Sequence, residues 1–107
     1  METEMEKGMN VIMDLCVVPM GVGVSVSEYV AACQEILERA GLKYQLHAYG
    51  TNIEGEWDDV MSAVKTCHET IHAMGAPRIS TTIKLGTRID RTQTMEEKVA
   101  SVVAKLL

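Results

Sequence analysis

The segment KYQLHAYGTNIEGEW occupies residues 43–57 of the chain. Apolar and polar residues alternate from Lys43 to Tyr49, which is typical of a half-buried strand. Gly50-Thr51-Asn52 supplies turn chemistry, because Gly and Asn tolerate positive φ. Ile53 to Trp57 then reads as a short returning strand. The segment therefore predicts a β-hairpin.

Polar side chains gather beside the turn of this hairpin. They offer an imidazole, a phenol, a hydroxyl, an amide and two carboxylates, from His47, Tyr49, Thr51, Asn52, Glu54 and Glu56. A small ring compound needs such a mixture of an aromatic surface with donors and acceptors. An ordinary exposed His-Tyr pair is the alternative interpretation of His47 and Tyr49.

The bulk composition restricts the class of protein. The chain has 107 residues, enough for one domain with one core. Its formal net charge is −5, and we find no run of Lys and Arg, which argues against binding to nucleic acid. Aromatic residues make up only 4%, so stacking on bases has little support. A soluble globular domain is expected.

Several features indicate a reduced, cytoplasmic protein. Cys16, Cys33 and Cys67 are odd in number and far apart, which predicts neither a disulfide framework nor a zinc knuckle. No apolar run is long enough to span a bilayer. Residues 1–8 are charged and lack the apolar centre of a signal peptide, so we expect a flexible extension before a domain at 9–107.

The remaining elements follow from periodicity. A nearly continuous apolar run at 10–18 predicts a central strand buried on both faces. Helical spacing follows an apparent capping box at Ser25 and Glu28 and recurs at about 58–74. Residues 78–89 alternate cleanly, and a second capping box at Thr94 and Glu97 opens a last helix.

The order β-α-β-β-α-β-α predicts an α+β fold of the ferredoxin-like, split βαβ kind. Its four-stranded antiparallel sheet would carry the two crossover helices on one face, with an additional C-terminal helix. The other face would then lack a helix while exposing apolar residues of the central strand. Such a face predicts a partner, most simply a second copy of the chain.

Two short motifs invite catalytic interpretations. His68-Glu69-Thr70-Ile71-His72 matches the H-E-x-x-H pattern of zinc hydrolases, yet no His or Cys follows residue 72 to supply a third ligand. Gly21-Val22-Gly23 follows a strand, but the full G-x-G-x-x-G pattern is absent because position 26 is Val. Two His on a helix flank and a plain connecting loop are the preferred interpretations, and no metal or catalytic residue is assigned.

Lys84 and Arg88 lie on one face of the last predicted strand. They are about 13 Å apart along it. A solvated strand face is the simpler interpretation. An anion site for sulfate or phosphate, closed by another subunit, is the functional alternative.

The chain resembles a family of small thiamine-binding-like proteins that was long catalogued as uncharacterised. The resemblance covers about residues 9–107 and is most specific in the element Gly50-Thr51-Asn52-Ile53-Glu54-Gly55-Glu56. Further matching segments are Val17–Gly21, His68-Glu69, Arg78–Lys84 and Arg88-Ile89-Asp90. The resemblance implies a ferredoxin-like fold, assembly as dimers of dimers through the sheets, and no enzymatic activity.

The resemblance also implies a ligand zone. It would comprise Gly50, Thr51, Asn52 and Glu54, close to the loop at Pro19, Met20 and Gly21. His47 joins this zone from its place on the hairpin, and Lys84 with Arg88 would suit an anion. His68-Glu69 becomes a structural signature.

Three hypotheses follow for function. The first is a non-catalytic protein that binds thiamine or a related pyrimidine, without any other cofactor. The second is a homotetramer that binds a sulfate- or phosphate-like anion between subunits. The third is a metal hydrolase that uses His68, Glu69 and His72.

Overall fold

The computed structural model describes residues 8–106. The predicted N-terminal extension lies outside this range except for Gly8. The elements are β1 (Asn10–Met20), α1 (Ser27–Arg39), β2 (Lys43–His47), β3 (Gly50–Glu56), α2 (Trp57–Ala73), β4 (Arg78–Thr87) and α3 (Met95–Lys105). The predicted element order is confirmed, including the hairpin of β2 and β3. The position predicted for its turn is wrong, because the turn lies at residues 48 and 49 and Gly50-Thr51-Asn52 belong to β3.

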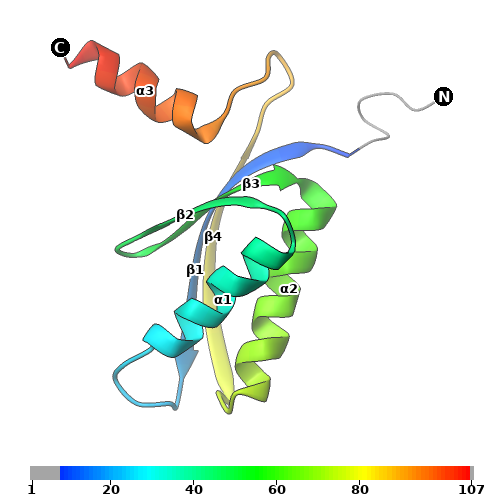
Figure 1. Ribbon diagram of the computed structural model, residues 1–107, viewed down its shortest axis with the longest axis vertical. Helices are drawn as coiled ribbons and strands as arrows, with labels where there is room; N and C mark the ends of the chain where they lie inside the picture. The colour runs from blue at the N-terminus through cyan, green and yellow to red at the C-terminus, as the bar shows by residue number, and fades with distance from the viewer. Residues whose placement is uncertain (1–7, 107) are drawn as a thin grey trace.

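The strands form an antiparallel sheet in the order β2-β3-β1-β4. Helices α1 and α2 cover one face of this sheet (Figure 1). This is the predicted α+β, ferredoxin-like arrangement, and β1 is central as expected. We call the sheet side toward α1 and α2 the helix side and the opposite side the open face.

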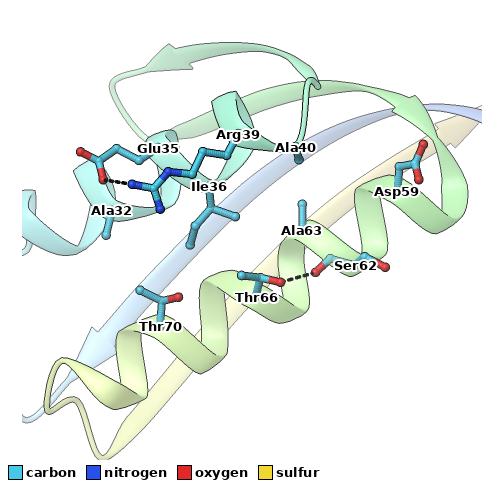
Figure 2. A pocket seen from close by; sticks show the side chains of 10 residues that line it. All are labelled: Ala32, Glu35, Ile36, Arg39, Ala40, Asp59, Ser62, Ala63, Thr66 and Thr70. Carbon is cyan, nitrogen blue, oxygen red and sulfur yellow. Dashed lines mark hydrogen bonds and ion pairs between the residues drawn. The ribbon is translucent and has the colours of Figure 1, made fainter.

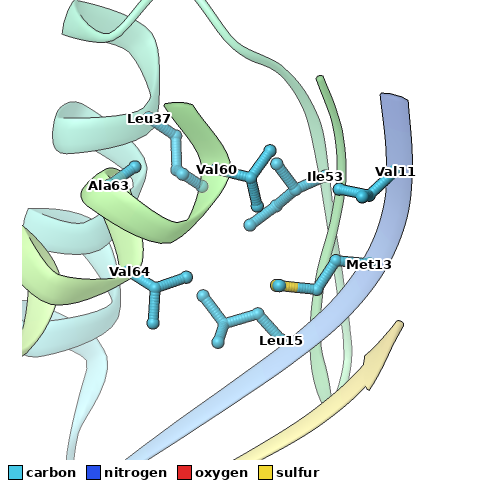
Figure 3. Close-up of a cluster of buried hydrophobic side chains, with 8 residues drawn as sticks. All are labelled: Val11, Met13, Leu15, Leu37, Ile53, Val60, Ala63 and Val64. Atoms are coloured by element: carbon cyan, nitrogen blue, oxygen red, sulfur yellow. The ribbon is translucent and has the colours of Figure 1, made fainter. Parts of the chain in front are cut away.

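The core lies between the helix side of the sheet and the two helices (Figure 3). Alternate residues of the strands meet the apolar stripes of α1 and α2 there. The buried cluster consists of Val11, Met13, Leu15, Leu37, Ile53, Val60, Ala63 and Val64. Each large apolar side chain buried in this way contributes about 1.5–3 kcal/mol to folding. This cluster fixes the register of β1 against β3.

In the described part of the chain, the open face lacks a helix and exposes apolar residues of the central strand, as the order of elements predicted, but the burial of β1 on both faces is not observed (Figure 1). Strand β1 was expected to be buried on both sides, yet Val18 and Met20 on its open face are 44% and 42% exposed. Ile12 and Cys16 on the same side are only half-buried. The reason is that neither α1 nor α2 covers this face. One copy of the chain therefore leaves apolar surface of its central strand uncovered.

The helix starts agree with the sequence in one case and not in the other. Helix α1 begins at Ser27 with Val26 as its N-cap, and no side chain caps it. The capping box expected from Ser25 and Glu28 is therefore wrong, because Ser25 lies before the first turn. Helix α3 begins as predicted, with the Thr94 hydroxyl accepting a hydrogen bond from the Glu97 amide at 3.1 Å.

Among residues 8–106, helix α3 contacts the rest of the domain only through its first turn. Met95 is buried, whereas Val99, Val102 and Leu106 are exposed by 61%, 60% and 77%. Figure 1 shows the helix extending away from the sheet. The apolar stripe that the sequence predicted for this helix is thus present but unpacked within one chain.

Candidate functional site

Strand β3 carries half of the predicted ligand residues, and its alternation sends them to opposite sides of the sheet. The side chain of Thr51 lies on the helix side in line with Ile53 and is buried. Asn52 and Glu54 lie on the open face, beside Asp14 and Ile12 of β1. The structure therefore does not gather Thr51, Asn52 and Glu54 around one point.

Glu54 holds the start of α3. Its Oε1 accepts a hydrogen bond of 2.7 Å from the Met95 amide, and Lys43 Nζ lies 3.8 Å from the same oxygen. Lys43 also forms an ion pair with Glu96, which raises the pKa of Lys43 and lowers the pKa of Glu96. A carboxylate near the positive end of a helix is favourable. Glu54 thus positions α3 in this structure.

His47 makes its contacts on the open face. Its Nε2 donates a 2.6 Å hydrogen bond to Asp14 Oδ1, since its Nδ1 accepts a bond of 3.3 Å from the Tyr49 amide. Gly50 lies opposite His47 in the strand register. The Tyr49 side chain is exposed at the turn. His47, Asp14 and Asn52 therefore form a small polar cluster on an uncovered sheet surface.

Thr51 belongs to a second polar group, on the helix side. Gln34 Nε2 of α1 donates a hydrogen bond of 2.9 Å to Thr51 Oγ1. Gln34 Oε1 is buried and has no hydrogen-bond partner, the one side-chain atom of this kind within residues 8–106. Leu46 lies beside Thr51 in the register and is 53% exposed. Two polar side chains thus meet inside the helix–sheet layer close to its edge.

The segment Pro19-Met20-Gly21, predicted as a loop, does not join the hairpin, and its first two residues are the end of β1 instead. Pro19 pairs with Ile79 of β4, while Thr51 pairs with Leu15 of β1. Pro19 is four residues beyond Leu15, which corresponds to about 13 Å along a strand. Pro19 is buried and Met20 is exposed on the open face. The predicted proximity of this segment to the ligand zone is not observed.

The two cations predicted for an anion site are also separate. Arg88 follows β4 and its guanidinium donates to both carboxylate oxygens of Asp90, at 2.6 and 2.9 Å, and to Gln93 at 3.0 Å. This contact lowers the pKa of Asp90. Lys84 lies on the open face directly opposite Asp14. Arg88 is therefore paired with Asp90, and Lys84 has the carboxylate residue Asp14 opposite it in the sheet.

The two histidines of the H-E-x-x-H motif make structural contacts. His68 Nε2 lies 2.6 Å from Thr81 Oγ1 of β4, and His72 Nδ1 donates a hydrogen bond of 2.8 Å to the Ala76 carbonyl. Because a carbonyl oxygen only accepts, His72 Nδ1 carries the proton. Within residues 8–106, no group of three or more His, Cys, Asp or Glu side chains is arranged to hold a metal.

An open groove of about 430 Å³ lies between α1 and α2 (Figure 2). Its floor is formed by small and apolar side chains such as Ile36 and Ala63, and the Glu35–Arg39 ion pair lies along one rim. The groove contains none of the residues that the sequence singled out. Among the described helices, none has the length and apolar character needed to cross a membrane.

Two polar residues of the site were not recognised from the sequence. Asp14 appeared only as an interruption of an apolar strand, and its contact with His47 depends on the register of three strands. Gln34 occupies a position between the buried Cys33 and Leu37 of α1. A polar residue within an apolar helical stripe was the signal that could have revealed it.

The comparisons with known proteins agree with this fold and with the resemblance. The family model described as "Thiamine-binding protein" matches residues 13–103. The UPF0045 protein sll0230 of Synechocystis is 69% identical over 96 residues, covering 90% of this chain and 79% of that protein. The UPF0045 protein ECM15 of Eremothecium gossypii is 42% identical over 99 residues, covering 92% and 94%.

Solved structures show the same architecture. The hypothetical protein MJ1052 of Methanocaldococcus jannaschii superposes with a TM-score of 0.82 at 30% identity, covering 89% of this chain and 97% of that one. A Thermotoga maritima protein, TM0486, described as a candidate thiamine biosynthesis or salvage protein, gives a TM-score of 0.73 at 25% identity, covering 87% and 98%. By its sequence and its fold, the chain belongs to the thiamine-binding protein family, whose curated relatives carry the UPF0045 name.

Proposed function

We propose that this protein binds thiamine or a related pyrimidine without catalysing a reaction, on the helix side of β3 beside Thr51. One observation carries the location: Thr51 and Gln34 form a polar pair inside an otherwise apolar layer, next to the half-exposed Leu46. Buried polar groups that break the local pattern are most common at functional sites. The family match and the description of the Thermotoga protein support the choice of ligand.

The charge of the chain suits this ligand. Thiamine carries a positive charge on its thiazolium ring, and the chain has a formal net charge of −5. Three free cysteines in the described part of the chain support a reducing, cytoplasmic location as part of the same proposal.

A second copy of the chain covers the open face in this proposal. The open face exposes Val18 and Met20, and α3 exposes Val99 and Val102 without a place to pack in its own chain. A helix of this length is marginal in water unless its apolar face is buried. One chain therefore offers two unpartnered apolar surfaces, which supports a homo-oligomer built as a dimer of dimers.

Calorimetry with thiamine tests the proposal, and two neighbouring residues locate the site. Thr51→Val keeps the shape of the side chain and removes its hydroxyl on the helix side, so we expect affinity to fall about tenfold, as for one lost buried hydrogen bond. Asn52→Ala alters the open face only and should leave affinity unchanged. Thr82→Val, on the open face of β4, is the matched control.

The outcomes separate the two sides of the sheet. A loss of affinity in Asn52→Ala but not in Thr51→Val would move the ligand to the open face, near His47 and Asp14. An absence of heat and of thermal stabilisation with millimolar thiamine would end the proposal. Circular dichroism of each variant confirms that the domain is folded.

Anion binding between subunits is the alternative function. Lys84 supports it, because this cation lies on the open face that a second copy would cover. Arg88 supports it less, since Asp90 and Gln93 already occupy its donors. Light scattering with and without sulfate tests this alternative. A mass that is independent of sulfate and of Lys84→Ala would contradict it.

A further inference from the structure

Gln34 lies in α1 where the helix presents its apolar face to the sheet. Cys33 and Leu37, on either side in the same stripe, are both buried. The carboxamide of Gln34 reaches β3 and donates from Nε2 to Thr51 Oγ1. Burying a carboxamide is unfavourable unless its polar atoms form hydrogen bonds.

The hydrogen bonding of this carboxamide is incomplete. Gln34 Oε1 is buried and unpaired within the described part of the chain. A carboxamide oxygen can accept two hydrogen bonds. Buried polar atoms in folded proteins are almost always bonded to protein, to water or to a ligand. The position therefore suits a donor that comes from outside the chain.

The surroundings of Gln34 indicate what kind of donor fits. The nearest hydrogen-bonding partner, the Thr51 hydroxyl, is neutral. One turn further along α1, Glu38 is engaged by the hydroxyl of Tyr44, whose pKa is raised by this contact. Leu46 supplies a half-exposed apolar surface beside Thr51. An apolar surface next to a neutral acceptor suits a flat ring that bears an amino group.

We propose that Gln34 Oε1 accepts a hydrogen bond from an amino group of the bound heterocycle, and that Gln34 selects amino-substituted rings over their oxo counterparts. This inference rests on the proposed function, because it concerns the same site. In the structure Nε2 donates to Thr51, which leaves Oε1 as the carboxamide atom that is free to accept a hydrogen bond from the ligand. An oxo ring would oppose one acceptor with another and leave both unpaired.

The test compares three ligands by calorimetry: thiamine, 4-amino-2-methylpyrimidine and the corresponding 4-oxo pyrimidine. Wild-type protein should bind the amino ring at least tenfold more tightly than the oxo ring. Gln34→Ala should lower affinity for the amino ring about tenfold and abolish this preference. Gln34→Glu should still bind the amino ring, since a carboxylate accepts hydrogen bonds from the amino group and from the Thr51 hydroxyl.

Gln45 supplies the matched control. It lies on β2, faces the open side and pairs with Asn52 in the register. Gln45→Ala should leave both affinity and selectivity unchanged. In wild-type protein, the side-chain amide NMR signal of Gln34 should shift on addition of the amino ring, while that of Gln45 should not. This second readout does not depend on how well a variant folds.

Each outcome has a separate meaning. Three results would overturn the role of Gln34 while thiamine binding stands. They are equal affinity for the amino and oxo rings, wild-type affinity and selectivity in Gln34→Ala, and a Gln34 NMR signal that does not shift. Binding of the amino ring at Gln34 without any binding of thiamine excludes thiamine itself, leaves a related pyrimidine as the ligand and supports the role of Gln34. A protein that binds none of the three overturns both.

Discussion

His47 Nε2 lies 2.6 Å from Asp14 Oδ1, although strand β3 runs between their two strands. Gly50 makes this contact possible, because it is the β3 residue opposite His47 and has no side chain. A Cβ added at Gly50 would lie 2.7 Å from the Leu15 carbonyl oxygen and 3.2 and 3.3 Å from His47 and Asp14. The absence of a side chain at Gly50, the first residue of β3, thus has a steric explanation.

The first prediction is that Gly50→Ala destabilises the domain. The Leu15 carbonyl belongs to the backbone of the central strand and cannot move aside without disturbing the sheet. Overpacking of this kind costs about 1–3 kcal/mol, which corresponds to a fall in melting temperature of roughly 4–8 °C per kcal/mol. Thermal denaturation measures it.

Gly86→Ala is the control for this prediction. Gly86 lies in β4, and a Cβ there would meet nothing within 4 Å. Its melting temperature should stay the same or rise slightly, because Ala restricts the unfolded chain more than Gly. Equal melting temperatures for the two variants would contradict the steric role of Gly50.

The second prediction concerns pH and the start of α3. The ion pair with Lys43 lowers the pKa of Glu96, so its contribution is present above the ordinary glutamate value and disappears as the pH falls through the folded value. The raised pKa of Lys43 acts in the opposite direction, and its contribution disappears as the pH rises through that value. The ion pair should therefore stabilise the start of α3 most strongly at pH values between the pKa of Glu96 and the pKa of Lys43.

Hydrogen exchange of residues 95–105 measures this effect. Lys43→Met should speed exchange in α3 at neutral pH and have little additional effect in acid, where Glu96 is already neutral. Arg39→Met, which removes the exposed pair with Glu35 at 3.8 Å, is the control and should leave α3 unchanged. A Lys43→Met variant with wild-type exchange in α3 would show that the ion pair does not hold the helix.

The sequence predicted the elements well because their signals are local. Alternation in 78–89 and helical spacing in 58–74 correspond to β4 and α2, within a few residues at their ends. The order of elements, combined with the rules of connection, was enough for the sheet topology. The start of α1 was wrong by one residue, because Val26 and not Ser25 is its N-cap, so capping-box spacing alone did not locate the first turn.

The arrangement of the site could be predicted only in part. The opposite orientation of Thr51 and Asn52 follows from strand alternation, but it was missed because the sequence analysis assigned both residues to the turn instead of to β3. The contact of His47 with Asp14 could not be predicted, because it joins residues 33 apart and needs the register of three strands. The role of Glu54 depends on where α3 begins in space, which no local pattern records.

The third prediction concerns the H-E-x-x-H motif. His68→Ala removes the contact with Thr81 and should cost about 1–3 kcal/mol of folding stability, because it leaves a half-buried hydroxyl without its partner. Glu69 is exposed on α2, so Glu69→Gln should leave the melting temperature unchanged. A chelator should likewise leave it unchanged. A fall in melting temperature with the chelator would instead favour a metal site.

The fourth prediction tests the unpacked stripe of α3. Val102 is 60% exposed in one chain, and a carboxylate at this position would have to be buried if a second copy covers the stripe. Val102→Asp should therefore reduce the mass in solution from a multiple of 11.8 kDa toward that of one chain, as measured by size exclusion with light scattering.

Ala104→Asp is the matched control for Val102→Asp, because helical spacing places Ala104 on the opposite side of α3 from the stripe. Both variants introduce the same charge, and Ala104→Asp loses more helix propensity than Val102→Asp because Ala is the better helix former, so propensity alone would affect the control more. Only burial of the stripe predicts a lower mass for Val102→Asp than for Ala104→Asp. If the wild-type protein and both variants all have a mass of 11.8 kDa in solution, a second copy of this chain does not cover the apolar stripe of α3.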